Sequence, residues 1–296
     1  MRKNILYVLF ISIVLASCEK DVLFKEPKFD EKLVVEGHIE TGQPPYIILT
    51  RNTKYYGQAS LNDIGNSFVH NAIIKVSNGI DTVTLTEMTI DTAGITIGIY
   101  TDPTFFINPS ATKILGQSNT SYSLWIEAGG LKVSSVTTIP QSYPLDSIWY
   151  EENVVSTKPN LVRLMCRYTD PPELGQYARY FTSRNNQAFL PGYSSVFEDN
   201  LINGTTFDFP LDRGVNRNAS DSSIFKDYGY FYKGDTITLK WCNIDYYTYK
   251  FYRTLEFELN NDGPFSSPVM VQSNIKNGLG VWAGYNTSFK TLVIPH

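Results

Sequence analysis

The sequence predicts a mainly β protein, in which an N-terminal immunoglobulin-like β-sandwich precedes a second β-rich domain carrying one amphipathic helix. Short runs rich in β-branched and aromatic residues alternate with Gly, Pro and Asn turn signals, a pattern typical of strands. A single segment near residue 250 has a helical period. A disordered chain is excluded, because 42% of the 296 residues are hydrophobic and 14% are aromatic.

The first 17 residues predict a secretory signal peptide. Arg2 and Lys3 form a short positive region, and the apolar run over residues 5–16 is about a dozen residues long. A helix that spans a bilayer needs roughly 20 residues, whereas the apolar region of a signal peptide has this shorter length. The segment ends in Leu15-Ala16-Ser17-Cys18, which resembles the lipobox of bacterial lipoproteins.

In such lipoproteins the cysteine is acylated and becomes the first residue of the mature chain. Cys18 is therefore the predicted lipidation site, and its acyl chains are the predicted contact with the outer membrane. The alternative is an ordinary secretory signal with an incidental cysteine. Stable anchoring needs two or more acyl chains. Removing residues 1–17 leaves 23 basic and 29 acidic residues, a net charge of −6. The mature chain therefore gains no electrostatic attraction to anionic lipids, and the acyl chains alone would hold it at the membrane.

Residues 18–31 form the predicted lipidated tether, which is charged and contains one proline. Its first residues, Glu19-Lys20-Asp21, resemble the short acidic export signals that direct lipoproteins of Bacteroidota to the outer face of the outer membrane. We therefore expect a lipid-anchored protein facing the cell surface, with a periplasmic orientation as the alternative. The net charge of −4 for the whole chain argues against a nucleic-acid partner, since such proteins carry a basic surface.

Residues 32–141 form the predicted sandwich domain. Its clearest element is a hairpin whose strands are joined by Gly129-Gly130, since a two-residue turn of the primed type needs positive φ at both positions. The predicted strands of this domain cover residues 33–39, 46–50, 72–77, 82–86, 121–128 and 131–139.

Residues 142–296 form the predicted second domain, and Pro140 and Pro144 bracket the junction between the two. Its predicted strands cover residues 147–154, 161–168, 177–183, 206–209, 229–232, 236–241, 280–285 and 290–294.

The predicted helix covers about residues 244–259. Apolar residues recur there every three or four positions, which is typical of a helix that packs one face on a sheet. Asn243 is a plausible N-cap, Asp245 favours the positive end of the helix dipole, and Asn260-Asn261-Asp262-Gly263-Pro264 provides the stop. The predicted apolar stripe consists of Ile244, Tyr247, Phe251, Leu255 and Leu259.

Residues that carry catalysis or bind metals are scarce. The chain has three histidines, His38, His70 and His296, and no His-x-x-x-His, Cys-x-x-Cys or calcium-loop pattern. The nucleophile, dinucleotide and phosphate-loop motifs are also absent. We therefore predict no catalytic residue, no metal site, no cofactor and no enzyme activity. Two carboxylates distant in sequence could still meet across a cleft, so a surface hydrolase remains an alternative.

Tyrosines give one candidate contact surface. If residues 228–232 form a strand, alternation places Tyr228, Tyr230 and Tyr232 on one face, where they could contact a ligand or a protein partner. The plainer interpretation, which we favour, is that they are core residues or cross-strand pairs.

Two cysteines remain beside Cys18. Basic residues alternate with apolar ones around Cys166, so Cys166 is expected to point into a core, and Cys242 follows Trp241 at the end of another strand. Two cysteines do not define a disulfide framework, and the sequence leaves a bridge between them open.

Several segments together resemble the Bacteroidota lipoproteins of the domain-of-unknown-function family DUF4249. The most specific are Leu33-Val34-Val35-Glu36-Gly37 and Asn277-Gly278-Leu279-Gly280, and the resemblance extends over essentially the whole mature chain. Members of that family are often encoded beside TonB-dependent outer-membrane receptors, which implies an accessory role at a transporter. The resemblance brings no catalytic residues, so only the acylated cysteine carries over, to Cys18.

The leading hypothesis is therefore a non-catalytic surface lipoprotein that partners a TonB-dependent receptor and helps to capture or hand over a ligand. The second is a structural lipoprotein, either an adhesin or a component of envelope assembly. The third is a hydrolase that acts on a surface polysaccharide or peptide.

Overall fold

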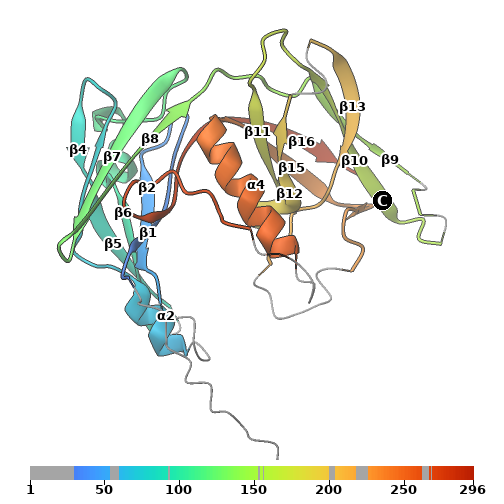
Figure 1. Cartoon of the computed structure of the whole chain (residues 1–296). Coiled ribbons are helices and arrows are strands. Elements are labelled where there is room, and N and C mark those ends of the chain that lie inside the picture. The colour runs from blue at the N-terminus through green and yellow to red at the C-terminus, as the bar shows by residue number, and fades with distance from the viewer. Residues whose placement is uncertain are drawn as a thin grey trace, which may run out of the picture. The chain divides into compact units, whose positions relative to one another are not determined.

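The computed structural model shows a chain built mainly from β-sheets (Figure 1). It describes residues 30–53, 60–92, 94–152, 154–155, 157–199, 204–217, 226–261, 267 and 269–296. The predicted signal peptide, Cys18 and residues 19–29 of the predicted tether lie outside these residues. The mainly β class is confirmed, and the immunoglobulin-like detail stays a prediction.

One large mixed sheet organises residues 31–296, which form one compact unit. Within the described residues, its strands follow the order β12-β11-β15-β16-β1-β2-β6-β5. The bounds are β1 Leu33–Glu40, β2 Tyr46–Arg51, β5 Thr86–Thr92, β6 Ile95–Thr101, β11 Tyr177–Arg184, β12 Leu190–Glu198, β15 Thr236–Ile244 and β16 Leu279–Val293.

Strand β16 connects the two halves of this sheet. Its residues 279–285 pair in parallel with β1, and its residues 286–293 pair antiparallel with β15. The prediction of two separate strands at 280–285 and 290–294 is wrong, because residues 286–289, which look like a connection in the sequence, pair with residues 240–243 of β15. This pairing between distant segments outweighs the local turn preference of Asn286.

A second sheet packs on the N-terminal part of the large one. It contains β4 Thr82–Thr84, β3 Ile73–Ser77, β7 Thr120–Ala128 and β8 Leu131–Ile139. The predicted hairpin is confirmed, since β7 and β8 are joined by Gly129 and Gly130 with φ of 57° and 80°. The core between the sheets includes Leu33, Leu124 and the fully buried Trp282.

A third sheet packs on the C-terminal part. It contains β13 Thr206–Leu211, β10 Leu161–Thr169 and β14 Phe231–Tyr232, with β9 Ser147–Glu151 paired to β10. Cys166 lies in the core below it, as predicted. Cys242 belongs to a different buried cluster, and both thiols are free.

Helix α4, Tyr246–Asn260, packs against β11, β12 and β16 (Figure 1). Its N-cap is Asp245, whose side chain accepts from the Thr248 N–H at 2.7 Å, so the prediction of Asn243 is wrong. Asn243 still belongs to β15, and its side-chain oxygen accepts from the Tyr143 N–H at 2.7 Å. Because β15 continues to Ile244, the N-cap lies two residues later in the chain than predicted.

The buried face of α4 also differs from the predicted stripe. Tyr247 and Leu259 are 63% and 48% exposed, whereas Tyr249 and the carboxylate residue Glu256 are buried. The difference arises because the Ser195 N–H donates a hydrogen bond to the Glu256 carboxylate below the helix. A prediction from the spacing of apolar residues does not include such a buried polar contact.

Three short helical segments were not predicted. They are α2 Leu61–Ser67, α3 Thr104–Ile107 and a 3-10 turn at Pro109–Ala111. Helix α2 starts with a capping box in which Ser60 and Asp63 satisfy each other's backbone N–H groups. No helix in the described part of the chain is long and apolar enough to cross a bilayer.

Candidate functional site

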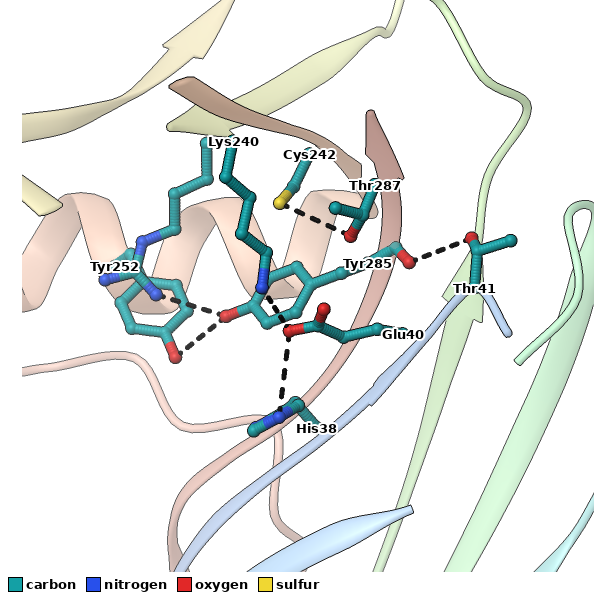
Figure 2. Close-up of polar contacts among 9 residues, drawn as sticks. His38, Glu40, Thr41, Lys240, Cys242, Tyr252, Tyr285 and Thr287 are labelled. Atoms are coloured by element: carbon teal, nitrogen blue, oxygen red, sulfur yellow. Dashed lines mark hydrogen bonds and ion pairs between the residues drawn. The ribbon is translucent and has the colours of Figure 1, made fainter. Parts of the chain in front are cut away.

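The candidate site lies where β1 ends and β16 continues beyond it, on the sheet face that α4 covers. There, polar side chains from six elements meet, although buried sheet faces are normally apolar. We call this group the junction cluster. Figure 2 labels His38 and Glu40 of β1, Lys240 and Cys242 of β15, Tyr285 and Thr287 of β16, Tyr252 of α4, and Thr41; Arg179 of β11 and Tyr46 of β2 complete it.

A lysine–glutamate pair forms the base of the junction cluster. Lys240 Nζ lies 2.5 Å from Glu40 Oε1, and these side chains are only 13% and 16% exposed. His38 Nε2 lies 3.8 Å from the same carboxylate oxygen, which is too long for a hydrogen bond. The imidazole ring instead stacks on Tyr46 at a centroid distance of 5.1 Å.

The surroundings of His38 keep its ring neutral. Burial lowers the pKa of the imidazole to about 4, and the positive charges of Lys240 and Arg179 act in the same direction, while Glu40 opposes them. The side chain nevertheless keeps 35% of its area exposed, so solvent reaches the ring. At pH 7 a neutral imidazole therefore offers one donor and one acceptor to a ligand.

Arg179 connects the sheet to α4. Its Nη1 donates to Tyr285 Oη at 3.1 Å, its Nε donates to Ser195 Oγ at 3.1 Å, and its guanidinium lies 3.3 Å from the ring centroid of Tyr252. The Ser195 N–H and hydroxyl both donate to the Glu256 carboxylate. A buried cation and a buried carboxylate are thus linked through one serine, which fixes the helix on the sheet.

The pKa shifts of Glu256 and Arg179 reflect both their burial and their partners. Burial raises the pKa of the Glu256 carboxyl, although Ser195 and Arg179 act to lower it. Burial alone would lower the pKa of Arg179, but Tyr252, Tyr285 and Glu256 raise it, and the guanidinium keeps its charge. The network is therefore structural in character, since its members satisfy one another.

Cys242 is protonated at neutral pH. Burial raises the pKa of its thiol to about 12, and Sγ lies 3.6 Å from Thr287 Oγ1. Reactive cysteines need the opposite shift, because the thiolate is the nucleophile. Cys242 is therefore not an activated nucleophile.

A groove opens beside the junction cluster. It encloses about 360 Å³, with His38 and Glu40 in its lining. Phe106 and Phe289 also line it and are 66% and 57% exposed. Such an arrangement can hold a small polar or aromatic group, through hydrogen bonds at the base and ring contacts at the rim. No group of three or more His, Cys, Asp or Glu in the described residues could hold a metal ion.

The three predicted tyrosines lie elsewhere and do not form a ladder. The strand there covers only Phe231–Tyr232, so the alternation assumed over residues 228–232 is wrong, and Tyr228 lies in a turn. Tyr228 Oη accepts from the Tyr193 N–H at 3.0 Å, Tyr230 Oη accepts from Arg163 at 3.4 Å, and Tyr232 Oη donates to Asp227 at 2.9 Å. Their contact with a ligand or partner stays a prediction.

Sequence reasoning missed most of the junction cluster. It placed His38 in a strand and gave no role to Arg179, Lys240 or Tyr285. One signal was present, since Lys240 stands between Leu239 and Trp241 in a strand whose other face is also buried. A cation at such a position needs a partner, but the sequence does not indicate that the partner is Glu40.

Comparison with protein families matches residues 19–291 to the family described as "Domain of unknown function (DUF4249)". The chain belongs to this family. A search of curated proteins finds no match to it. The two segments most specific to the resemblance are neighbours in the sheet, since Val34 and Val35 pair with Leu279 and Gly280. They form the parallel ladder that leads directly to the junction cluster.

Proposed function

We propose that this DUF4249 protein is a lipid-anchored outer-membrane protein, facing the cell surface, that acts as a non-catalytic ligand-binding or accessory partner of a TonB-dependent transporter. The observation that carries the anchor is the sequence Leu15-Ala16-Ser17-Cys18 after a short apolar segment. The accessory role is supported by the resemblance, whose members are often encoded beside such receptors.

The geometry of the junction cluster supports binding over bond-making chemistry. Lys240 and Glu40 pair with each other, the Cys242 thiol is protonated, and His38 makes no hydrogen bond to a nucleophile among the described residues. The groove beside it presents exposed aromatic rings, which are the residue type enriched where proteins meet partners and ligands.

Replacement of Cys18 tests the anchor. Cys18→Ser is expected to abolish incorporation of a labelled fatty acid and to release the protein from the membrane fraction, because Cys18 is the predicted attachment point of the acyl chains. Cys166→Ala is the matched control, since Cys166 is buried and should leave labelling unchanged. Labelling that survives Cys18→Ser would refute the anchor, and protease treatment of intact cells decides the orientation.

Co-purification tests the partner. The tagged chain, extracted in mild detergent, is expected to bring down a TonB-dependent receptor. Phe289→Ser at the exposed rim of the groove is expected to weaken this capture without unfolding the chain, since that side chain is 57% exposed. Absence of any such receptor, together with a deletion strain that loses attachment or envelope integrity but keeps nutrient uptake, would favour the structural hypothesis instead.

A further inference from the structure

A second cavity, distinct from the junction groove, lies among β10, β11, β12, β13 and β15. It encloses about 160 Å³. Trp241 lines it, and alternation along β15 places Trp241 on the opposite face from Lys240 of the junction cluster. A cavity of similar size in a protein interior accepts a group as large as benzene. We call it the aromatic cavity.

Six aromatic residues line it, Tyr177 of β11 among them. Phe197 stacks on Trp241 at a centroid distance of 5.8 Å, and Phe209 and Tyr168 lie 6.2 and 5.8 Å from the same indole. Phe207 extends the wall, 5.3 Å from Phe209. Rings arranged around an open space, instead of filling it, favour an apolar stem or a cation over their faces.

Buried polar atoms without partners line the same cavity. Asp170, Asp199 and Asn243 are only 3%, 4% and 3% exposed. Among the described residues, Asp170 Oδ1, Asp199 Oδ1, Gln176 Oε1 and Asn243 Nδ2 have no hydrogen-bond partner. A buried acceptor without a donor loses the hydrogen bonds that it made to water in the unfolded chain. Three of these atoms are acceptors, and their gathering at one cavity indicates that a ligand supplies the missing donors.

The other oxygen of each carboxylate is held in place. Asp199 Oδ2 accepts from the N–H groups of Gly175 and Gln176 at 2.9 and 3.1 Å, and Asp170 Oδ2 accepts from the Gly204 N–H at 3.2 Å. These bonds orient the carboxylates, so that one oxygen of each stays available. The unpartnered oxygens are therefore held in fixed positions by hydrogen bonds to the backbone.

The two aspartates of the cavity have no cationic partner among the described residues. The lining of the cavity contains Asp170, Glu198 and Asp199 but no Lys, Arg or His. Burial, together with the negative charge of Asp199, raises the pKa of the Asp170 carboxyl, although the Gly204 N–H acts to lower it. A cation in the cavity would relieve this repulsion.

We propose that the aromatic cavity binds a primary alkylammonium group, with its methylene stem against the rings and its charged end on Asp170 and Asp199. A primary ammonium has three N–H donors and no acceptor, which equals the three unpartnered acceptors Asp170 Oδ1, Asp199 Oδ1 and Gln176 Oε1. A quaternary ammonium would satisfy the rings but leave these acceptors without donors. The amine belongs either to a small free amine or to a lysine side chain.

This inference gives a ligand class for the ligand-binding role proposed above, but the binding itself requires neither the transporter nor the lipid anchor. Calorimetry on the detergent-solubilised full chain therefore tests it separately from co-purification. The probe is n-butylammonium, with n-butanol as the uncharged analogue and tetramethylammonium as the analogue without N–H donors. Saturable binding is expected for n-butylammonium, at least tenfold tighter than for either analogue.

Variants locate the site. Asp170→Asn and Asp199→Asn are each expected to weaken n-butylammonium binding at least tenfold, whereas Asp208→Asn should not change it. Asp208 is the matched control because it is an exposed aspartate of β13 that pairs with Arg167. Phe197→Leu keeps the apolar bulk but removes one ring, and it provides a second test if an aspartate variant fails to fold.

Two results would overturn the inference. One is the absence of saturable n-butylammonium binding at millimolar concentration, which would leave ordered water as the partner of these atoms. The other is binding that Asp170→Asn, Asp199→Asn and Phe197→Leu leave unchanged. If the inference holds, comparison of 1,4-diaminobutane with Nα-acetyl-lysine N-methylamide distinguishes the sources, because the tighter ligand identifies a free amine or a peptide side chain.

Discussion

Replacement of His38 should reduce the loss of folding stability that occurs when the pH is lowered. The folded chain lowers the pKa of this imidazole from 6.5 to about 4. Between these values the unfolded chain binds a proton that the folded chain does not, so the free energy of unfolding falls as the pH falls. Stability that depends on neutral His38 is therefore fully present above pH 6.5 and is lost towards pH 4. His38→Gln removes this contribution to the slope.

The size of the effect follows from the two pKa values. Each pH unit between them is worth about 1.4 kcal/mol, so lowering the pH from 6.5 to 5.0 would cost about 2 kcal/mol for a fully buried ring. The His38 side chain is 35% exposed, and solvent screening reduces this to about 1 kcal/mol. The lost stacking on Tyr46 lowers the stability of the variant equally at both pH values, so it does not enter the slope.

Urea unfolding at pH 7.5 and pH 5.0 measures the difference. The wild-type chain should lose about 1 kcal/mol more than His38→Gln between these conditions. Tyr46→Phe is the matched control, since it keeps the stacked ring and adds no group that titrates in this range; its loss should equal that of the wild type. Identical pH dependence in the wild type and His38→Gln would refute the assignment of a neutral, desolvated imidazole.

Three further predictions concern the sheet, the helix cap and the thiols. Gly284→Ala should lower the free energy of unfolding, measured in urea, by about 1–3 kcal/mol, because the new Cβ would lie 2.8 Å from the backbone of β8. The control is Gly65→Ala in α2, which should be neutral or stabilising because no atom lies nearer than 3.6 Å to the new Cβ. Asp245→Ala should lower the free energy of unfolding by about 2–3 kcal/mol, since this carboxylate caps α4 and also accepts hydrogen bonds from a hydroxyl and an N–H of β8 at 2.7 and 2.9 Å. Asp245→Asn should lower it by less. Equal losses in the two variants would contradict the charged cap. Cys166 and Cys242 should react with a thiol reagent only on unfolding, as both are buried with raised pKa values, and rapid labelling of the native chain would contradict this.

The features that could be predicted from sequence are those encoded by neighbouring residues. The hairpin through Gly129 and Gly130 follows from local turn geometry, and its strands were predicted to within one residue. The existence of α4 followed from a helical period, but its buried face did not. That face depends on Arg179 and Ser195, which accommodate Glu256 below the helix.

The features that could not be predicted depend on pairing between distant segments. Glu40 and Lys240 are 200 residues apart in sequence, and their ion pair exists only because β1 and β15 flank the same strand. Asp170 and Asp199 look like ordinary loop residues at the ends of strands. Only the folded structure shows that each keeps an unpartnered oxygen in one cavity.

Strand β15 makes the two sites separable in experiment. Lys240 contributes to the junction cluster, while its neighbour Trp241 faces the aromatic cavity. Because adjacent strand residues point to opposite faces, and because β15 is paired along both edges, a change on one face need not displace the other. Loss of receptor capture with intact amine binding would therefore locate the partner at the junction groove, and the reverse pattern would show that the ligand is recognised without contributing to assembly.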